Sequence, residues 1–434
     1  MTQAIQKRLP LDNLDASLIA YEMFSDLMIQ LEMVFEAPLD SDRLTQAALL
    51  TLLSEPKLGC RLVNHWRKPY WQKVTFSKEQ VFTSASSQAE YDEFKKTPPH
   101  PYSGPQMRIC LFNASRNTQL LVKVSHQAAD AAGVKDICRL LASSYSALAT
   151  DRDYRPEIHS GQSTDCQYLV NLVPKKDRRA LKKQHMEYTR LGRIPCSTFK
   201  LPFEGGPNES LSFLQRTVSD PQIEALKDYG KKHNATLNDL FLSAFFRAQA
   251  QAGNWDGQRQ LALNMTVDFR KHLPENQASK VTNLSIPLKY WPCLENDLGN
   301  DFSDTLSKIT AATRRRKQSY FGLDFLQYVR PFVRYFPHFL SHAGIRQEVR
   351  KEQKLDNWAD TFTNMGPIKS SVVWFDSKPV RAHLLPPSKY PPYFILGVSG
   401  YEGAVTFSIS AYNAQKELSL RFLDALVNEL RQII

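Results

Sequence analysis

Glycine-rich phosphate-binding motifs are missing from this sequence. Its 434 residues include only 17 glycines, and no stretch matches GxGxxG or GxxxxGK[ST]. Those patterns place backbone amides around the phosphates of a dinucleotide or a nucleoside triphosphate. We therefore expect neither kind of nucleotide site, and we predict no permanently bound cofactor.

Long hydrophobic runs are also missing. No run reaches the roughly 18 apolar residues that a transmembrane helix needs. The opening MTQAIQKRLPLDNLD is polar and lacks the apolar segment of a signal peptide. We expect no transmembrane segment and no signal peptide, and the expected location is the cytoplasm.

Cysteine is sparse, and its spacing is irregular. The six cysteines form no CxxC pair: Cys60, Cys110, Cys138, Cys166, Cys196 and Cys293. Paired spacings are typical of zinc sites, whereas scattered thiols are typical of reduced cytosolic proteins. We predict no structural zinc site and no other metal site.

Positive charge, in contrast, is in excess, with a formal net charge of +11. Much of it lies in three clusters, at 175–183, 314–317 and 346–354. Such a surface suits nucleic acid, an acidic protein or a phosphate-bearing substrate, although each cluster is also typical of a solvated helix face. Because neither a C2H2 spacing nor an RNP1-like segment is present, we expect no nucleic-acid partner.

Apolar periodicity predicts two similar α/β halves. In the first half, strands are predicted at 28–36, 58–63, 70–74, 107–112 and 120–124, and helices at 43–53 and 134–149. In the second half, strands are predicted at 211–218, 261–267, 283–288, 393–398 and 404–412, and helices at 221–233, 237–250, 302–318 and 414–433. A polar, basic connection separates them, with one helical piece near 178–188. The predicted domains are 1–195 and 196–434.

One stretch, Gln119–Gly133 (QLLVKVSHQAADAAG), joins a predicted strand to a predicted helix. His126 stands where the strand ends, small residues follow, and Asp130 comes four positions later. An imidazole so placed can take a proton from a hydroxyl or an amine. Chance alone also gives about one such pair for ten histidines and 44 acidic residues. The alternative is a buried structural histidine, with Asp130 capping the helix.

Five segments, in order along the chain, carry a resemblance to a known family. They are LEMVFEAPLDSDRLTQAALLTLLSEPKLGCRLV with PYWQKV, SHQAADAAG, ATLNDLFLSAFFRAQA, LALNMTVDFRKHL with TNLSIPL, and TFTNMGPI with ILGVSGYEGAVTFSISAYN. Together they resemble the CoA-dependent acyltransferase superfamily over nearly the whole chain. Its members include free-standing condensation-domain relatives, alcohol and polyketide-associated acyltransferases and, more distantly, chloramphenicol acetyltransferase.

The resemblance implies an α/β fold of two chloramphenicol-acetyltransferase-like lobes in a V, with a central active-site tunnel. It also implies an acyltransferase of natural product biosynthesis, working as a monomer. The donor would be a phosphopantetheine thioester, on CoA or an acyl carrier protein, and the acceptor a small-molecule alcohol or amine. The aromatic-rich segment 325–339 would line an acyl pocket or simply belong to the core.

The resemblance also implies roles for individual residues. SHQAADAAG stands where the family carries HHxxxDG, so His126 of this HxxxD motif would be the general base. Asp130 would be structural and paired with Arg270. Asn364 matches an Asn-x-Gly near the family's site, and Gly133 ends the motif segment.

Two departures from the family motif leave alternatives open. Ser125 replaces the first histidine, and Ala131 replaces the glycine after the aspartate, where a methyl group would narrow the channel or alter the loop. The closing DFGWG of the plant branch is absent, which argues against that branch. The alternatives are a catalytically silent carrier-protein-binding module, or a dehydratase or cyclase acting on a tethered chain. The sequence leaves open the donor chain, the acceptor, and an ester or amide product.

Overall fold

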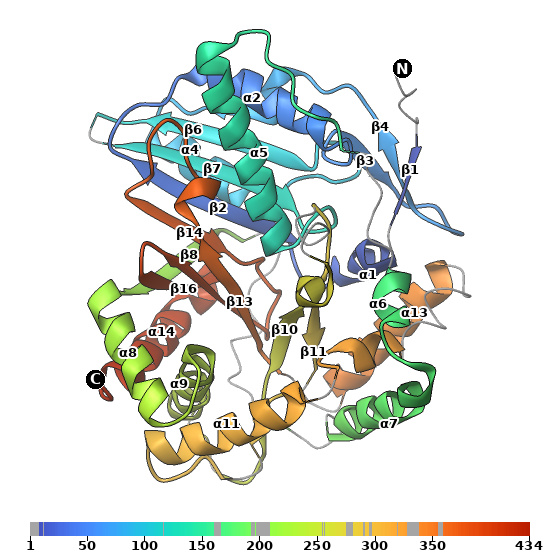
Figure 1. The fold of residues 1–434 in the computed structure, drawn as a ribbon, viewed down its shortest axis with the longest axis vertical. Helices are drawn as coiled ribbons and strands as arrows, with labels where there is room; N and C mark the ends of the chain where they lie inside the picture. Colours follow the sequence, from blue (N-terminus) through green and yellow to red (C-terminus); the bar gives the residue numbers. More distant parts are fainter. Residues whose placement is uncertain are drawn as a thin grey trace.

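The structure is a computed structural model that describes most of the chain. The residues outside this description are 1–7, 12, 116, 160–165, 192–195, 197–208, 254, 256, 275–280, 290, 295–296, 319, 328–337 and 355–358. Most of the aromatic segment 325–339 thus lies outside the described residues. In the described part, helices and strands alternate along the chain, as predicted for an α/β protein (Figure 1).

The first large sheet occupies the upper part of the molecule in Figure 1. Its strand order is β14-β2-β7-β6-β5, and neighbouring strands are antiparallel except for β5 and β6. The strands are β2 (Met28–Phe35), β5 (Phe82–Ser84), β6 (Met107–Asn113), β7 (Thr118–Ser125) and β14 (Arg381–Leu385). The helices on its two faces are α2 (Ser41–Ser54), α4 (Gln88–Lys96) and α5 (Ala131–Thr150). Strand β7 is central, which explains its apolar sequence.

Side chains along β7 alternate between the two faces of this sheet. Leu120 and Val122 join the core beneath α2 and α5, whereas Leu121 packs in a smaller cluster against α4. Lys123 lies on the same side as Leu121 and is fully buried, and its ammonium donates to the carbonyls of Phe94 and Thr97. The one lysine in this apolar strand is therefore satisfied by backbone at the end of α4.

The second large sheet has the order β11-β10-β13-β15-β16-β8, with β10–β13 and β13–β15 parallel. Its strands are β8 (Leu211–Val218), β10 (Asn264–Asp268), β11 (Ser285–Leu288), β13 (Thr361–Ile368), β15 (Ile395–Tyr401) and β16 (Ala404–Tyr412). The helices that pack with it are α8 (Asp220–Lys232), α9 (Leu237–Ala252), α11 (Phe302–Lys317) and α14 (Lys416–Arg431). Helix α9 begins with the predicted capping box, because Thr236 and Asp239 each accept the other's backbone N–H.

Further elements surround the two large sheets. They are β1 (Arg8–Pro10), α1 (Asn13–Tyr21), β3 (Cys60–Val63), β4 (Tyr70–Lys73), α3 (Lys78–Val81), β9 (Leu261–Ala262), the 3-10 turn η1 (Phe269–His272), β12 (Cys293–Leu294) and α13 (His338–Lys354). Strands β1, β4 and β3 form a small sheet, and β9 pairs with β12.

The predicted boundary at residue 195 does not separate the two large sheets. Strand β14 comes from the second predicted domain, yet it pairs with β2. The N–H of Leu384 in β14 also donates to the Ser399 hydroxyl of β15 (3.1 Å). Strand β14 therefore ties the sheets together, and the V arrangement of two lobes stays a prediction.

The connection between the predicted halves contains two helices, α6 (Cys166–Asn171) and α7 (Lys175–Leu191). Leu169, Val173 and Leu181 are buried in the core of the second sheet. Within α6, α7 and the described turn between them, few apolar residues reach the core, so the sequence pattern indicated little more than the centre of α7.

Among the helices that are described, none has both the length and the apolar character to cross a membrane. The cytoplasmic location and the monomeric state stay predictions.

Candidate active site

His126 follows the last residue of β7, where the chain turns toward α5. Its backbone N–H donates to the carbonyl of Leu27 (2.7 Å), and its side chain is half-buried. Ala128 and Ala129 are fully buried in the turn. These small residues let the turn pack closely in the middle of the molecule, where α5 approaches β10 and β11 (Figure 1).

The imidazole of His126 contacts the side chain of Asn283, just before β11. Its Nδ1 lies 3.0 Å from Asn283 Oδ1. The Asn283 Nδ2 donates to the carbonyl of His126 (2.9 Å) and to Asp15 Oδ1 (2.8 Å). Asp15 Oδ2 in turn forms a buried ion pair with Lys57 (3.0 Å). A chain of contacts thus runs from the ring through an amide to a buried ion pair.

Burial sets the protonation of the His126 ring. It lowers the pKa of His126 below the usual value, while the negative charge of Asp130 and the contact with Asn283 oppose this shift. A lowered pKa means that the ring is mostly neutral at pH 7. A neutral imidazole can accept a proton, as a general base must.

Asp130 and Arg270 form the buried ion pair that the resemblance implied. Asp130 Oδ2 lies 2.8 Å from Arg270 Nη1, and the side chains are 2% and 8% exposed. The same oxygen accepts the backbone N–H groups of Leu284 (2.8 Å) and Ser285 (2.9 Å). The Arg270 Nη2 donates to the carbonyl of Thr282 (2.8 Å). The pair therefore fixes the start of α5 against the segment that leads into β11.

Charge complementarity keeps the Asp130 carboxylate ionised. Burial alone would raise its pKa, but Arg270 and the backbone N–H donors more than compensate and lower the pKa of Asp130 to about 2. For Arg270, burial would lower the pKa, but Asp130 and Asp268 raise it above the usual value. Both groups are thus charged at physiological pH.

The structure places the other predicted site residues in different settings. Ser125 is fully buried, and its hydroxyl donates to the Gln127 side chain. Gly133 is buried in the first turn of α5, and its N–H donates to Asp130 Oδ1 (3.0 Å). Asn364 is exposed on β13, where its amide donates to Asn238 (3.0 Å). His126, Asp130, Gly133 and Arg270 thus gather around the segment before β11, and the contacts of Asn364 lie elsewhere.

Three residues of this site were not expected from the sequence. Asn283 lies within the quoted TNLSIPL segment, but no role was assigned to it. No sequence pattern linked Asp15 or Lys57 to the site, because Asp15 is 268 positions from Asn283 along the chain. Only the folded chain brings these polar groups together.

Metal-binding clusters are absent from the described part of the chain. No group of three or more His, Cys, Asp or Glu side chains there could hold a metal ion. The lack of a metal site in the whole protein stays a prediction.

Comparisons with known proteins place this arrangement among solved folds. No family model and no curated protein matches the sequence. Solved structures match nearly the whole chain. The epimerization domain from the third module of tyrocidine synthetase B is 14% identical, with 99% of this chain and 97% of that chain covered and a TM-score of 0.67.

Two further matches are proteins with other activities or associations. The trichothecene 15-O-acetyltransferase TRI3 from Fusarium sporotrichioides is 11% identical, with 98% and 92% covered and a TM-score of 0.72. Polyketide synthase associated protein 5 from Mycobacterium tuberculosis is 13% identical, with 98% and 99% covered and a TM-score of 0.66. The chain therefore shares the fold of these condensation-type and acetyltransferase structures. The resemblance stated from the sequence is confirmed at the level of fold.

Within this condensation-like fold, the change of glycine to Ala131 has a simple structural setting. Ala131 is the first residue of α5 and lies after the N-cap Asp130. A helical backbone position accepts alanine without strain, unlike a left-handed position that requires glycine. The methyl group therefore imposes no unusual backbone angle on the turn.

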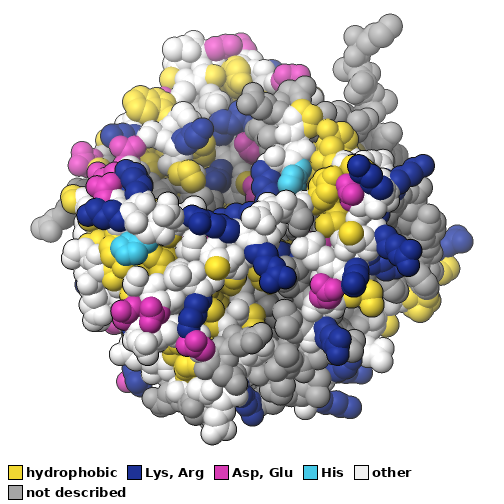
Figure 2. All heavy atoms as spheres, turned by 60° about the horizontal axis from the view of Figure 1, so that its bottom comes forward, with side chains coloured by type: hydrophobic (Ala, Val, Ile, Leu, Met, Phe, Trp, Pro, Cys, Tyr) yellow, Lys and Arg dark blue, Asp and Glu magenta, His cyan; other side chains and the backbone are white. Residues whose placement is uncertain are grey.

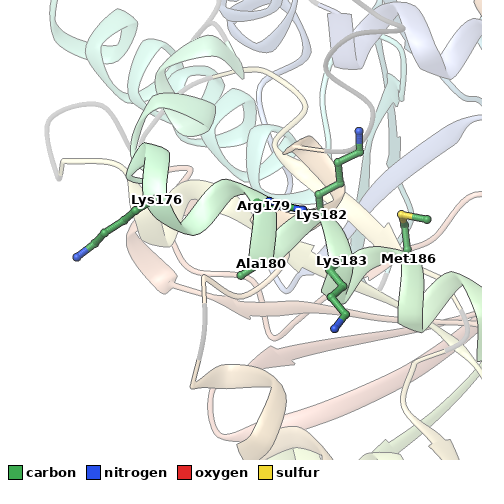
Figure 3. A pocket seen from close by; sticks show the side chains of 6 residues that line it. All are labelled: Lys176, Arg179, Ala180, Lys182, Lys183 and Met186. Atoms are coloured by element: carbon green, nitrogen blue, oxygen red, sulfur yellow. The ribbon is translucent and has the colours of Figure 1, made fainter.

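The positive charge lies partly on the exposed face of α7. Figure 2 shows Lys and Arg side chains gathered on the side of the molecule where α7 lies. Lys176, Arg179, Lys182 and Lys183 line a shallow hollow with Ala180 and Met186. Figure 3 shows the ammonium groups of Lys176, Lys182 and Lys183 pointing in different directions. This surface, which we call the α7 basic face, produces a diffuse positive potential and not a convergent phosphate site.

The prediction that residues 314–317 form a basic surface is wrong for Arg316. Arg316 is 3% exposed and pairs with Asp324 at 2.8 Å. The neighbouring Arg314, Arg315 and Lys317 are exposed. Arg316 faces inward because the helical repeat turns one residue in each three or four toward the core.

Proposed function

We propose that this chain is an acyltransferase that moves an acyl group from a thioester, on CoA or a carrier protein, to a hydroxyl or amine acceptor. His126 is the observation that supports this best. It is a half-buried histidine at a strand end with a lowered pKa, on a fold shared with an acetyltransferase and with condensation-type domains.

In this mechanism the His126 ring is the general base. Its nitrogen accepts the proton of the acceptor O–H or N–H as that oxygen or nitrogen attacks the thioester carbonyl carbon. The tetrahedral intermediate then expels the pantetheine sulfur, and the imidazolium returns the proton to the thiolate. A C–O or C–N bond forms, the C–S bond breaks, and no further reactant is consumed.

Asp130 and Arg270 have a structural role in this proposal. Their ion pair holds the start of α5 against the segment before β11, so that the side chains of His126 and Asn283 keep their contact. Asp130 Oδ2 is already engaged by Arg270 and two backbone N–H groups. The carboxylate therefore supports the ring's position and does not handle substrate.

The first test is the replacement of His126 by alanine. The protein is incubated with a panel of acyl-CoAs, acyl carriers, alcohols and amines, and product mass and thiol release are measured. His126→Ala should stay folded and lose turnover by roughly 100-fold or more, the scale of a general base. The exposed His100→Ala is the matched control and should keep full activity.

The same assay gives a pH test. Since the pKa of His126 is lowered, kcat/KM should stay constant from pH 8 to below about 6.5, the ordinary histidine value. It should then fall as the ring becomes protonated at lower pH. Wild-type turnover in His126→Ala, or a profile that rises as pH falls, would defeat the assignment.

A second candidate is a non-transfer enzyme, a dehydratase or cyclase on a tethered chain. It is supported by the cyclization-docking bidomain from Sorangium cellulosum among the structural neighbours. Intact-mass analysis of an acyl carrier separates the two. Acyl transfer removes the acyl group from the carrier, whereas dehydration, or a cyclisation that forms its ring by loss of water, leaves the chain on the carrier and lowers its mass by one water. Carrier binding with no change of mass would instead support the silent module.

A further inference from the structure

The orientation of the Asn283 side-chain amide is determined by its surroundings. Asn283 is 3% exposed. Its Nδ2 faces three oxygen acceptors, namely Asp15 Oδ1 (2.8 Å) and the carbonyls of His126 (2.9 Å) and Gln127 (3.3 Å). Only an NH2 group can donate to these acceptors, with one of its two hydrogens shared between two of them, whereas a reversed amide would set four oxygen atoms against each other. The atom that faces the imidazole is therefore the amide oxygen.

That oxygen favours one ring nitrogen as the carrier of the proton, beside the backbone hydrogen bonds of the ring at His126 and Ala129. Asn283 Oδ1 lies 3.0 Å from His126 Nδ1 and can only accept a hydrogen bond. In a neutral ring, Nδ1 must then carry the proton, and Nε2 carries the lone pair. We propose that Asn283 is a positioning residue that holds His126 in the Nδ1–H tautomer, with its own amide oriented by the Asp15–Lys57 ion pair.

The Asp15–Lys57 pair explains why the side-chain amide of Asn283 cannot flip and exchange its oxygen and NH2 positions. The side chains of Asp15 and Lys57 are 1% and 8% exposed, and Lys57 also donates to the carbonyl of Ala128 (3.1 Å). Lys57 donates to Asp15 Oδ2, and a carboxylate paired with an ammonium accepts hydrogen bonds but donates none. Asp15 Oδ1 therefore requires a donor, and the NH2 group of Asn283 is that donor. A buried ion pair contributes little net stability, so an orienting role accounts for its presence better.

This arrangement links four separate parts of the fold. Asp15 belongs to α1, Lys57 follows α2, His126 follows β7, and Asn283 precedes β11. For catalysis the inference rests on the proposed function, because a general base needs its lone pair on the nitrogen that meets substrate. The tautomer itself is a property of the folded protein and can be measured without any turnover.

The closing experiment begins with histidine ring nitrogen NMR at neutral pH, with His126 assigned through His126→Gln. We expect the wild-type ring to have a protonated Nδ1 and an unprotonated Nε2. In Asn283→Ala the proton should redistribute toward Nε2. The matched control is Asn264→Ala, which removes another asparagine that donates to a backbone carbonyl, at the far end of β10. An Nε2–H ring in the wild type, or an unchanged ring in Asn283→Ala, would overturn the inference.

Kinetics then separate orientation from simple structural damage. Asn283→Ala should lower kcat roughly 10- to 100-fold, the scale for residues that orient a functional histidine, with little change in KM. The exchange Asn283→Asp with Asp15→Asn keeps size and net charge and places a carboxylate against Nδ1. Because that carboxylate favours the imidazolium, the pH below which kcat/KM falls should move upward. A merely structural role for Asn283 would instead leave the ring tautomer unchanged in Asn283→Ala.

The proposed function and the positioning role of Asn283 would be contradicted by different results. Absence of turnover by the wild type would contradict the proposed function, while the ring nitrogen measurement still decides the tautomer. Normal turnover with an unshifted pH profile in the exchange variant would contradict the positioning role and leave His126 as the base.

Discussion

At the scale of single residues, Asp130 and Arg270 contribute unequally to their ion pair. Removal of Asp130 leaves the backbone N–H groups of Gly133, Leu284 and Ser285 without their acceptor, in addition to the guanidinium. Removal of Arg270 leaves a carboxylate that three N–H groups still stabilise. Buried groups that lose their partners carry a desolvation penalty, so the loss of Asp130 should cost more.

We therefore expect Asp130→Ala to lower the free energy of unfolding by about 3–5 kcal/mol, the range for one partner of a buried pair. Arg270→Ala should cost less, and so should Asp130→Asn, which keeps one acceptor oxygen. The double alanine variant should lose less than the sum of the single losses. Urea unfolding of the four variants measures each value.

An exposed ion pair provides the control for this series. Arg216 and Asp424 pair at 2.6 Å, with side chains 37% and 52% exposed. Asp424→Ala should change the free energy of unfolding by about 0–1 kcal/mol, because solvent screens such pairs. If Asp130→Ala were as mild as Asp424→Ala, the first turn of α5 would not depend on the buried pair.

At the scale of elements, the contact between α5 and the segment before β11 leaves no room for a side chain at Gly133. A Cβ atom there would lie 2.9 Å from the Ala129 Cβ and 3.3 Å from the carbonyl oxygen of Thr282. Thr282 also accepts from Arg270, so a shift of this backbone would disturb the ion pair as well. Glycine is thus required for a close approach and not for its backbone freedom.

Replacement of Gly133 by alanine tests this close approach. Alanine normally stabilises a helix interior relative to glycine by up to about 1 kcal/mol. Here we expect the opposite sign, a loss of about 1–3 kcal/mol from overpacking, together with reduced turnover. Thermal unfolding of Gly133→Ala measures the change. The control is Gly344→Ala in α13, where nothing lies within 4 Å of the added carbon and stability should stay equal or rise.

The helices and strands differ in whether their own residues carry the pattern that predicts them. The strand at 120–124 and the helix at 134–149 were predicted because each has its own apolar periodicity, and they correspond to β7 and α5. Strand β14 was missed because its five residues, RAHLL, become a strand through pairing with β2. Helix α4 was missed because it is polar and buries only Tyr91 and Phe94.

At the scale of the whole molecule, the α7 basic face offers a long-range attraction for a negatively charged donor. Phosphates of CoA and acidic surfaces of carrier proteins would both be attracted to it, in keeping with the proposed function. Such attraction acts mainly on association and weakens as salt screens it. The dispersed cations of α7 fit a steering role better than a specific phosphate site.

Charge reversal on α7 tests this idea. Lys182→Glu with Lys183→Glu should lower kcat/KM for the donor roughly 10-fold at low ionic strength, the lower end of electrostatic steering. The difference from wild type should shrink at high salt. Lys231→Glu with Lys232→Glu makes the same charge change on α8, which lies on the opposite side in Figure 1, and should have little effect. Equal losses in both variants would indicate net charge alone, and a salt-independent loss would exclude steering.

The sequence by itself determined the α/β class, most long elements and the pairing of Asp130 with Arg270. The first two follow from local periodicity, and the third from ordered segments that resemble a known family. It also singled out His126, through its position at a strand end among small residues.

Only the tertiary structure decided what surrounds the His126 ring. Asp15, Lys57 and Asn283 belong to separate elements, and their contacts carry no periodicity or spacing that one sequence reveals. It also decided that β14 joins the first sheet and that Arg316 is buried. Long-range pairing depends on how complete elements pack, so the orientation of the histidine was determined by folding and not by its neighbours in sequence.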